Sequence, residues 1–293
     1  MNHSIKVLDN FKGSLLELRN YPNLKKLKIV NTQFNEELKY LPVGLEVLEI
    51  YSCNFNQELK NLPLSLKRLN IEMCYNFNEK LDNLPIGLEV LEIDSNNFNQ
   101  ELNNLPESLK LLKIDSINFN QKLNKLPLGL KVLKIGCIYF DQKLDNLPLG
   151  LNVLEINSKC FNQELDKLPL GLKVLLIRSD TFVRRLNNLP VGLKELEIRS
   201  ENFNQKLENL PVDLKVLVIK SNKFNKKLNN LPLGLEVLEI YSCEFNQELE
   251  NLPLSLKKLD IGKDYLKYFS LEEVLGMIPF SCELYVDNKK IDL

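Results

Sequence analysis

Residues 231–251 read LPLGLEVLEIYSCEFNQELEN, and this 21-residue pattern recurs along most of the 293-residue chain. Each copy carries one phenylalanine, and a proline follows it eight residues later. Every step between phenylalanines is 21 residues except one of 22, where an additional residue lies within Cys74–Asn76. A fixed period of this length predicts a solenoid, in which one coil of chain stacks on the next. The eleven phenylalanines are Phe34, Phe55, Phe77, Phe98, Phe119, Phe140, Phe161, Phe182, Phe203, Phe224 and Phe245.

One copy of the pattern predicts a short strand followed by a return segment. The stretch from Val237 to Tyr241 alternates between two faces and is rich in β-branched residues, as half-buried strands are. Leu238 and Ile240 are expected to face the core, and the strands of successive coils are expected to pair in parallel. A single copy has too little apolar surface to fold alone, so stability is expected to come from stacking. The sequence therefore predicts a β-rich solenoid.

Polar residues also recur in columns. Asparagine follows nine of the eleven phenylalanines, with Asp141 and Val183 as the exceptions. Serine recurs two residues after the strand isoleucine, as at Ser95 and Ser242. Amides and hydroxyls repeated at the coil spacing can bond to the backbone and to their neighbours above and below. We interpret both columns as scaffold rather than as binding or catalytic sites.

The combination L-x-x-L-x-I followed by F-N-Q-x-L-x-N-L-P resembles the FNIP repeat, a leucine-rich-repeat relative found in social amoebae and in large DNA viruses that infect amoebae. The resemblance covers residues 24–262 in eleven copies. It implies a leucine-rich-repeat-like right-handed coil with one long parallel sheet on the concave face. The chain departs from the family pattern after F-N-Q, where Glu58, Glu101 or Lys122 stands in place of the usual proline or isoleucine.

The two ends of the chain depart from the repeat. FNIP repeats often follow an F-box, which would imply a cullin ubiquitin-ligase adaptor, but residues 1–23 are too few for an F-box and the role is not carried over. We expect residues 1–23 to form a degenerate coil that caps the solenoid. Residues 263–293 are expected to form the other cap, with a capping box at Ser270–Glu273 before a short helix and a strand at Glu283–Val286. The alternative is that this tail docks a partner.

Composition and motifs argue against catalysis and nucleic-acid binding. The 38 basic and 39 acidic residues give a net charge of −1, which supplies no bulk field for nucleic acid or an anionic membrane. The one histidine is His3, and no metal-spaced Cys/His set, phosphate loop or nucleophile motif occurs. We expect no enzyme activity, cofactor or metal. Without an apolar leader or a membrane-length apolar run, we expect an intracellular protein, in the host cytoplasm if the resemblance holds.

Six cysteines are spread along the chain with no C-x-x-C pair. Five of them lie one to three residues before a repeat phenylalanine, where we expect small side chains to turn inward. Buried, reduced thiols are the expected state. Pairing between neighbouring coils is left open for Cys53 with Cys74 and for Cys137 with Cys160.

Functional information is expected where the columns break on the outward strand face. Most coils carry valine just before the inward leucine, and this stripe either marks a contact surface or packs across the β-ladder. The next outward column is normally charged, but Leu176 and Val218 replace the charge, and four of the six arginines lie between 178 and 199. An apolar centre beside arginines is typical of interface hot spots. The predicted partner-binding residues are Val174, Leu176, Arg178, Arg199, Val216, Val218 and Lys220.

The sequence thus predicts a monomeric, non-enzymatic scaffold that binds a partner protein, a host protein if the resemblance holds, through its concave strand face. Two alternatives remain open at this stage. The first is a substrate-recognition subunit of a ubiquitin ligase that works without its own F-box. The second is a structural protein that assembles end to end through its caps.

Overall fold

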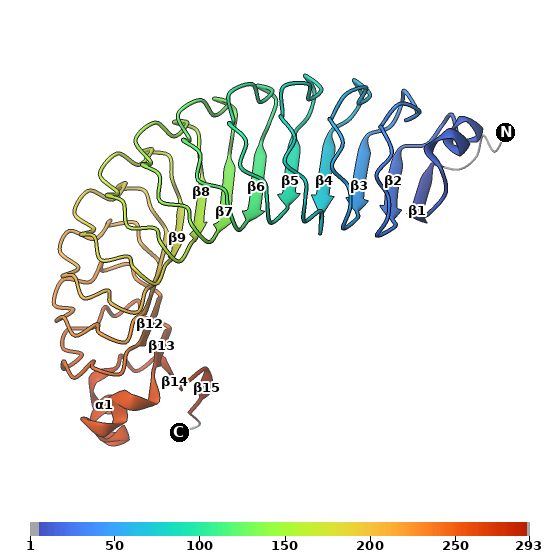
Figure 1. The fold of residues 1–293 in the computed structure, drawn as a ribbon. Coiled ribbons are helices and arrows are strands. Elements are labelled where there is room, and N and C mark those ends of the chain that lie inside the picture. The colour runs from blue at the N-terminus through green and yellow to red at the C-terminus, as the bar shows by residue number, and fades with distance from the viewer. Residues whose placement is uncertain (1–5, 292–293) are drawn as a thin grey trace. The chain divides into compact units, whose positions relative to one another are not determined.

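The structure of the chain is a computed structural model that describes residues 6–291. His3 lies outside the described residues. The chain divides into two compact units. The first contains the residues up to Gln142 together with Asn146–Leu151, and the second contains Lys143–Asp145 and the residues from Asn152 onward. Both units consist of short parallel strands joined by return segments that follow the irregular outer side of each coil (Figure 1).

The strands of the first unit pair in chain order. Each is parallel to the next, and the register advances by one repeat, so that Leu48 lies beside Leu27 and Leu69. A 3₁₀ helix, η1 (Leu15–Asn20), connects the first two strands and buries Leu15 and Leu18. The strands are β1 (Val7–Phe11), β2 (Lys26–Val30), β3 (Val47–Tyr51), β4 (Arg68–Glu72), β5 (Val90–Asp94), β6 (Leu111–Ser116) and β7 (Val132–Cys137).

The second unit repeats this arrangement and ends in a small helical segment. Its strands pair in chain order, parallel from β8 to β14, and the final strand turns back antiparallel. The strands are β8 (Val153–Asn157), β9 (Val174–Arg178), β10 (Glu195–Arg199), β11 (Val216–Lys220), β12 (Val237–Tyr241), β13 (Lys258–Ile261), β14 (Glu283–Val286) and β15 (Lys289–Lys290). Between β13 and β14 lie η2 (Lys263–Lys267) and α1 (Leu271–Met277).

The structure confirms the predicted fold class but corrects the number of coils. Eleven copies of the pattern were expected, whereas the chain makes about 13 turns. Strands β1, β13 and β14 extend the parallel pairing although none of them is followed by the repeat phenylalanine. The reason is that a parallel ladder needs only backbone hydrogen bonds and inward apolar residues, not the complete motif.

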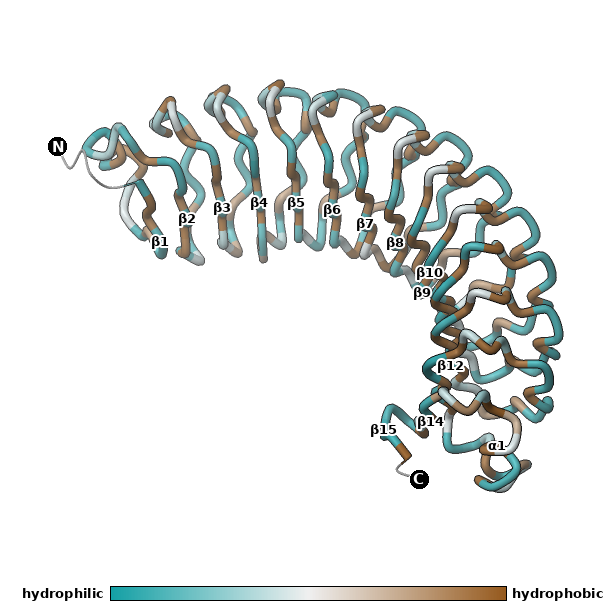
Figure 2. Tube along the Cα trace, turned by 180° about the vertical axis from the view of Figure 1, so that it is seen from behind, coloured by the Kyte–Doolittle hydropathy of each residue, from teal (hydrophilic) through white to brown (hydrophobic). Residues whose placement is uncertain are grey.

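The core is built from the columns that the repeat supplies. In β12, Leu238 and Ile240 are buried, while Val237, Glu239 and Tyr241 are half-buried on the other face, as the alternation predicts. Burial alternates in the same way along β2 and β3. Figure 2 shows hydrophobic and hydrophilic residues interspersed along the strands. The repeat phenylalanines are 0–3% exposed and stack within each unit at centroid distances of 5.8–6.1 Å. This separation lies in the range that offset aromatic pairs prefer.

The stacked rings continue past the last copy of the motif. Tyr265 of η2 lies over Phe245 at 5.4 Å and donates a hydrogen bond from its hydroxyl to the carbonyl oxygen of Gln247 at 3.0 Å. Phe269 then packs on Tyr265 at 4.8 Å. A tyrosine suits this position because its ring extends the core while its hydroxyl finds a partner at the edge.

The serine and asparagine columns are scaffold, as interpreted from the sequence. The buried hydroxyl of Ser95 donates to the carbonyl oxygen of Phe77 at 2.7 Å, which ties each coil to the preceding one. The side-chain oxygen of Asn35 accepts from the backbone N–H of Asn56 at 3.0 Å. Both patterns repeat in coil after coil, and they satisfy backbone groups that ladder bonds do not reach.

The turn that leads into each strand does not depend on glycine. In the copy at 231–251, the backbone N–H of Leu235 donates to the carbonyl oxygen of Pro232 at 3.0 Å. No glycine among the described residues has a positive φ, so the dihedral angles of the turn do not require glycine. Ser65 stands there in one coil, and its hydroxyl donates to the carbonyl oxygen of Leu45 at 2.6 Å.

The C-terminal segment contains the predicted helix and strand. Ser270 accepts a hydrogen bond from the backbone N–H of Glu273 at 3.2 Å, and the carboxylate of Glu273 accepts from the N–H of Ser270 at 2.7 Å. These two bonds form the capping box of α1. Asp287 and Asn288 adopt positive φ values of 49° and 64°, which turn the chain into β15. We propose that the described part of the predicted cap at 263–293, residues 263–291, covers the end of the core.

Candidate functional site

The seven predicted partner-binding residues lie on one face of three adjacent strands. Val174, Leu176 and Arg178 occupy alternate positions of β9, so they project to the same side. The parallel register places Glu195 between Val174 and Val216, Glu197 between Leu176 and Val218, and Arg199 between Arg178 and Lys220. The structure therefore brings all seven together across β9, β10 and β11.

Glu197 lies at the centre of this patch, and the sequence reasoning missed its role. Its exposed fraction is 7%. Its Oε1 atom accepts from Nε of Arg178 at 2.7 Å and from Nε of Arg199 at 2.5 Å. Arg178 also reaches Oε1 of Glu155 through Nη1 at 2.6 Å. The two arginines are thus paired with neighbouring carboxylates, and a comparison of residues 21 positions apart would have revealed Glu197.

The surroundings of Glu197 also set its protonation. Burial by itself would raise the pKa of this carboxyl group, because the charged form loses hydration. The hydrogen bonds from Arg178 and Arg199 outweigh burial, and the pKa of Glu197 lies below its ordinary value. The carboxylate is therefore charged at neutral pH and holds both arginine side chains in place.

A groove lies at the carboxyl ends of strands β8 to β12. Its volume is about 480 Å³. The Lys220 ammonium lies 4.3 Å from the ring centroid of Tyr241, and the Tyr241 hydroxyl donates to the side-chain oxygen of Asn288 at 2.9 Å. These contacts fix one wall of the groove. The lining residues are Asn157, Ser158, Lys159, Arg178, Ser179, Asp180, Arg199, Ser200, Glu201, Lys220, Ser221, Asn222 and Tyr241.

The apolar residues of the strand face are less exposed than an open stripe would be. Val174, Leu176 and Val216 are half-buried, and Val218 is only 7% exposed. Partial burial of this kind fits cross-strand packing on the ladder, one of the two interpretations of the valine column to which Val174 and Val216 belong. What remains accessible is the outer part of three aliphatic side chains beside Arg178.

A second apolar column, which the sequence reasoning did not identify, is far more exposed. The residue after the repeat proline is branched and aliphatic in ten of the eleven copies, and only Glu107 breaks the column. These side chains are 70–89% exposed, at the second position of the turn described above. We call this column the post-proline ridge. Its members are Val43, Leu64, Ile86, Leu128 and Leu149 in the first unit and Leu170, Val191, Val212, Leu233 and Leu254 in the second.

All six cysteines are free thiols, but not all are buried as expected. Cys74 and Cys137 occupy the inward serine column and are buried, and burial raises the pKa of each thiol to about 12. Cys160 and Cys243 are exposed, and Cys53 is half-buried. The difference arises because only the position three residues before the phenylalanine turns into the core.

The described part of the chain shows no cluster of metal-ligating residues. Among residues 6–291, no group of three or more His, Cys, Asp or Glu side chains could hold a metal ion. Within the same residues, no helix has both the length and the apolar character needed to cross a bilayer.

Comparison with solved structures identifies leucine-rich-repeat proteins. The chain is similar to CroV588, a circular leucine-rich-repeat protein of the giant virus CroV, with a TM-score of 0.76 and 30% sequence identity. The match covers 94% of this chain but 42% of CroV588. YopM from Yersinia enterocolitica WA-314 is similar with a TM-score of 0.58 and 21% identity, covering 96% of this chain and 62% of YopM. The chain therefore has a leucine-rich-repeat fold and spans less than two thirds of either protein.

Sequence-based comparisons add nothing more specific. No protein-family model matches the chain. No curated protein sequence matches it either.

Proposed function

We propose that this chain is a non-enzymatic interaction scaffold that binds a partner protein through the strand face of β9, β10 and β11. The observation that carries the proposal is the arrangement around Glu197, where accessible aliphatic groups lie beside two arginines held by one carboxylate. The same face borders a groove of about 480 Å³. Leucine-rich-repeat proteins commonly bind other proteins, which agrees with this assignment.

The ion pairs make the strand face suitable for recognition. Arg178 and Arg199 are already ordered in the free chain, so a partner would not need to immobilise them. Each arginine still has N–H groups beyond those that Glu197 accepts, because a guanidinium carries five donors. A partner surface with backbone carbonyl or side-chain amide oxygens above an apolar contact would fit both features.

The FNIP resemblance supplies the biological setting of the proposal. In that setting, the chain acts in the cytoplasm of an amoebal host, as a protein of the kind found in large DNA viruses. The similarity to CroV588 supports a viral context through one related structure. The partner is then a host protein.

The test compares two variants that alter the same outward column in different units. Leu176→Lys with Val218→Lys places lysines between glutamates, where Lys113 and Lys134 show that the column tolerates this residue. Lys113→Gln in the first unit is the matched control. Host proteins crosslinked to the wild-type chain in amoebal lysate would be identified, and their affinities for purified variants measured. The double variant should bind at least about tenfold more weakly and the control unchanged; equal binding by all three would refute the proposal.

A second candidate function is self-association through the post-proline ridge. The second position of a turn faces water, and nothing in the turn requires an aliphatic residue there. Five such side chains in consecutive coils of the second unit form an apolar surface larger than scattered exposed residues explain. A second copy of the chain presents the same spacing, so two ridges can interdigitate with residues matched pairwise. This proposal departs from the monomer expected from sequence.

Sedimentation velocity over a hundredfold range of concentration tests self-association. Wild-type protein should shift towards a dimer as concentration rises, and the variant Leu170→Gln, Val212→Gln, Leu233→Gln should remain monomeric. Because these side chains are 75–89% exposed, the substitutions should leave the fold intact. A wild-type chain that stays monomeric at the highest concentration would exclude this function and leave the strand-face proposal unaffected.

A further inference from the structure

The return segments of the second unit carry a cluster of cations that the strand-face proposal does not use. Arg185, Lys206 and Lys227 stand at the third position after the phenylalanine in three consecutive coils. Arg184 and Lys226 stand at the preceding position in two of these coils. In other coils the third position is either acidic or basic, and it is acidic on both sides of the cluster, at Glu164 and Glu248. Five cations in three coils are therefore a local feature of the array.

Most of these cations lack an intramolecular partner. Arg184 pairs with Glu164 at 3.2 Å, and Lys206 pairs with Glu208 at the same distance. Within residues 6–291, Arg185, Lys226 and Lys227 form no ion pair. Three of the five cations thus have no close ion pair among residues 6–291, although Lys227 also attracts the Glu248 carboxylate.

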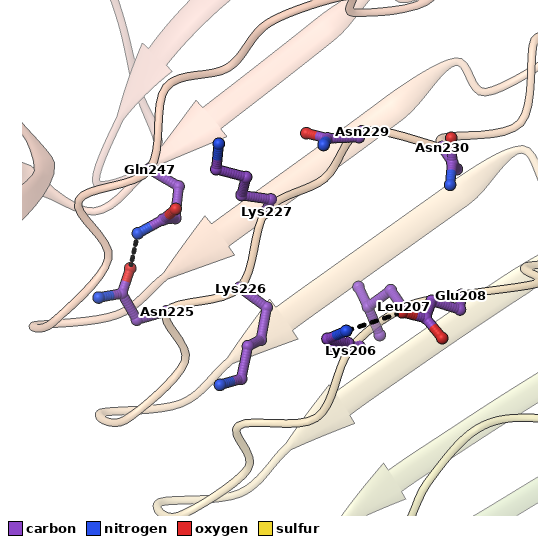
Figure 3. A pocket seen from close by; sticks show the side chains of 9 residues that line it. All are labelled: Lys206, Leu207, Glu208, Asn225, Lys226, Lys227, Asn229, Asn230 and Gln247. Carbon is purple, nitrogen blue, oxygen red and sulfur yellow. Dashed lines mark hydrogen bonds and ion pairs between the residues drawn. The ribbon is translucent and has the colours of Figure 1, made fainter.

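The cations line two adjoining grooves on the return side of the second unit. The first has a volume of about 370 Å³ and contains Lys206, Lys226 and Lys227 (Figure 3). The second has a volume of about 360 Å³ and contains Arg185. Lys206, Glu208 and Lys226 line both, so the two form one surface across three coils, which we call the return-side groove.

The remaining lining residues favour a polypeptide as the ligand. Besides the cations, the return-side groove is lined mainly by amide side chains, which offer both donors and acceptors. A peptide backbone presents both as well, whereas a phosphodiester backbone presents acceptors only. No aromatic side chain lines either groove for base stacking. The amide residues are Asn187, Asn204, Gln205, Asn225, Asn229, Asn230 and Gln247.

The first unit provides a natural contrast at the same level of the coil. Its return-side groove has a volume of about 210 Å³ and is lined by Glu37, Glu58 and Lys60 among others. Glu37 and Glu58 occupy the column that Arg185 and Lys227 occupy in the second unit. The backbone pattern is shared, so the sign of the charge is a property of these particular coils.

We propose that the return-side groove binds an acidic peptide segment in extended conformation, lying across the three coils. Side chains on one face of an extended peptide are spaced by roughly 6.6 Å, and neighbouring coils by about 4.8 Å at the strands. Long, flexible lysine and arginine side chains bridge this difference. Carboxylates of the peptide would pair with Arg185, Lys226 and Lys227. Its backbone would bond to amide groups other than the side-chain oxygens of Asn204 and Asn225, which the scaffold already uses. This surface is distinct from the strand face of β9 to β11.

The experiment uses a fluorescent 12-residue peptide of alternating glutamate and serine, with anisotropy measured at low salt. Binding to the wild-type chain is expected, and raising the salt should weaken it because the pairs are exposed. The variant Arg185→Gln, Lys226→Gln, Lys227→Gln should bind about tenfold more weakly, as expected for the loss of three surface ion pairs. The matched control is Lys80→Gln with Lys122→Gln, which changes the same column in the first unit and should bind as wild type.

Further probes decide between the proposal and its rivals. An all-serine peptide should not bind, and the strand-face variant Leu176→Lys with Val218→Lys should bind the acidic peptide as wild type does. Equal affinity of the triple variant and the wild type, or no binding of the acidic peptide at all, would overturn the proposal. Tighter binding of a 12-nucleotide oligouridylate than of the peptide would overturn it in favour of nucleic acid.

Discussion

The strand face and the return side of the second unit carry the same kinds of cation in different electrostatic states. On the strand face, Arg178 bridges Glu155 and Glu197, and Arg199 shares Glu197. On the return side, Arg185 and Lys227 have no ion-pair partner among residues 6–291. The comparison shows that the number of arginines in a coil does not determine the charge that a partner encounters.

The difference follows from how each segment is held. A strand residue is flanked by the residues one repeat before and after it, because the parallel register fixes its neighbours. A charge on a strand therefore meets whatever the adjacent coils carry in the same columns. On the return side, Arg185, Lys226 and Lys227 form no close ion pair among residues 6–291, and Glu208 pairs with Lys206 alone. The strand face is thus neutralised locally, and the return-side groove keeps its positive field.

The largest expected effect concerns the carboxylate that neutralises the strand face. Glu197→Gln removes the charge shared by Arg178 and Arg199, and should lower the free energy of unfolding by about 2 kcal/mol. Urea denaturation followed by circular dichroism measures this change. Lys206→Gln, which breaks an exposed pair with Glu208 on the return side, is the control and should change stability by less than about 0.5 kcal/mol. Equal effects would remove the distinction between the two surfaces.

The same ion pairs predict how stability depends on pH. Because the pKa of Glu197 is lower in the folded chain, its contribution is fully present above the ordinary glutamate pKa of about 4.3. The contribution is lost as the pH falls through the folded-state value, where the carboxylate becomes protonated. The stability difference between wild type and Glu197→Gln should therefore be largest near neutrality and shrink in acid. A difference that stays constant from pH 7 to pH 3 would contradict the assignment.

A smaller effect is expected where the asparagine column is interrupted. Val183 cannot accept the backbone N–H of Asn204, whereas Asn204 accepts that of Asn225 at 2.9 Å in the next coil. Val183→Asn should raise the free energy of unfolding by about 1 kcal/mol. Val183→Ala, which adds no acceptor, serves as the control and should not stabilise. The substitution leaves the return-side charges unchanged, so acidic-peptide affinity should not change with it.

The smallest expected effect is on the return side itself. Arg185→Gln with Lys227→Gln should alter the free energy of unfolding by less than about 0.5 kcal/mol, because neither cation has an intramolecular partner to lose. The measurement is again urea denaturation. A loss of stability as large as that of Glu197→Gln would mean that these cations are paired in the folded chain. The electrostatic difference between the strand face and the return side would then be refuted.

Much of the fold followed from the repeat, and the errors have a common origin. The columns of leucine, isoleucine and phenylalanine lie in the core as predicted, because each copy places them at the same phase of the coil. The count of coils was low because the end strands pair without the complete motif. Cys160 and Cys243 were expected to be buried, but they lie one or two residues beyond the inward position.

The candidate site was predicted only in part. Sequence identified Leu176 and Val218 as breaks in a charged column, and the structure places both beside Glu197. The importance of Glu197 was missed because a charged residue is the usual one in its outward column, and only exceptions to the column were considered. The post-proline ridge was missed for the same reason: Leu233 and its equivalents are regular, and function was expected only where the columns break.

The sequence by itself determined the period, the strand positions, the inward columns and the stacking of coils. This was possible because every coil of a fixed repeat buries the same positions against its neighbours. The spacing of apolar residues within one copy is therefore enough to identify those positions. Only the tertiary structure decided which surface charges are paired and which aliphatic residues remain in water. Those properties depend on the residues one coil away and on the direction of each side chain. For this reason the strand face is neutralised, whereas the return-side groove is positive.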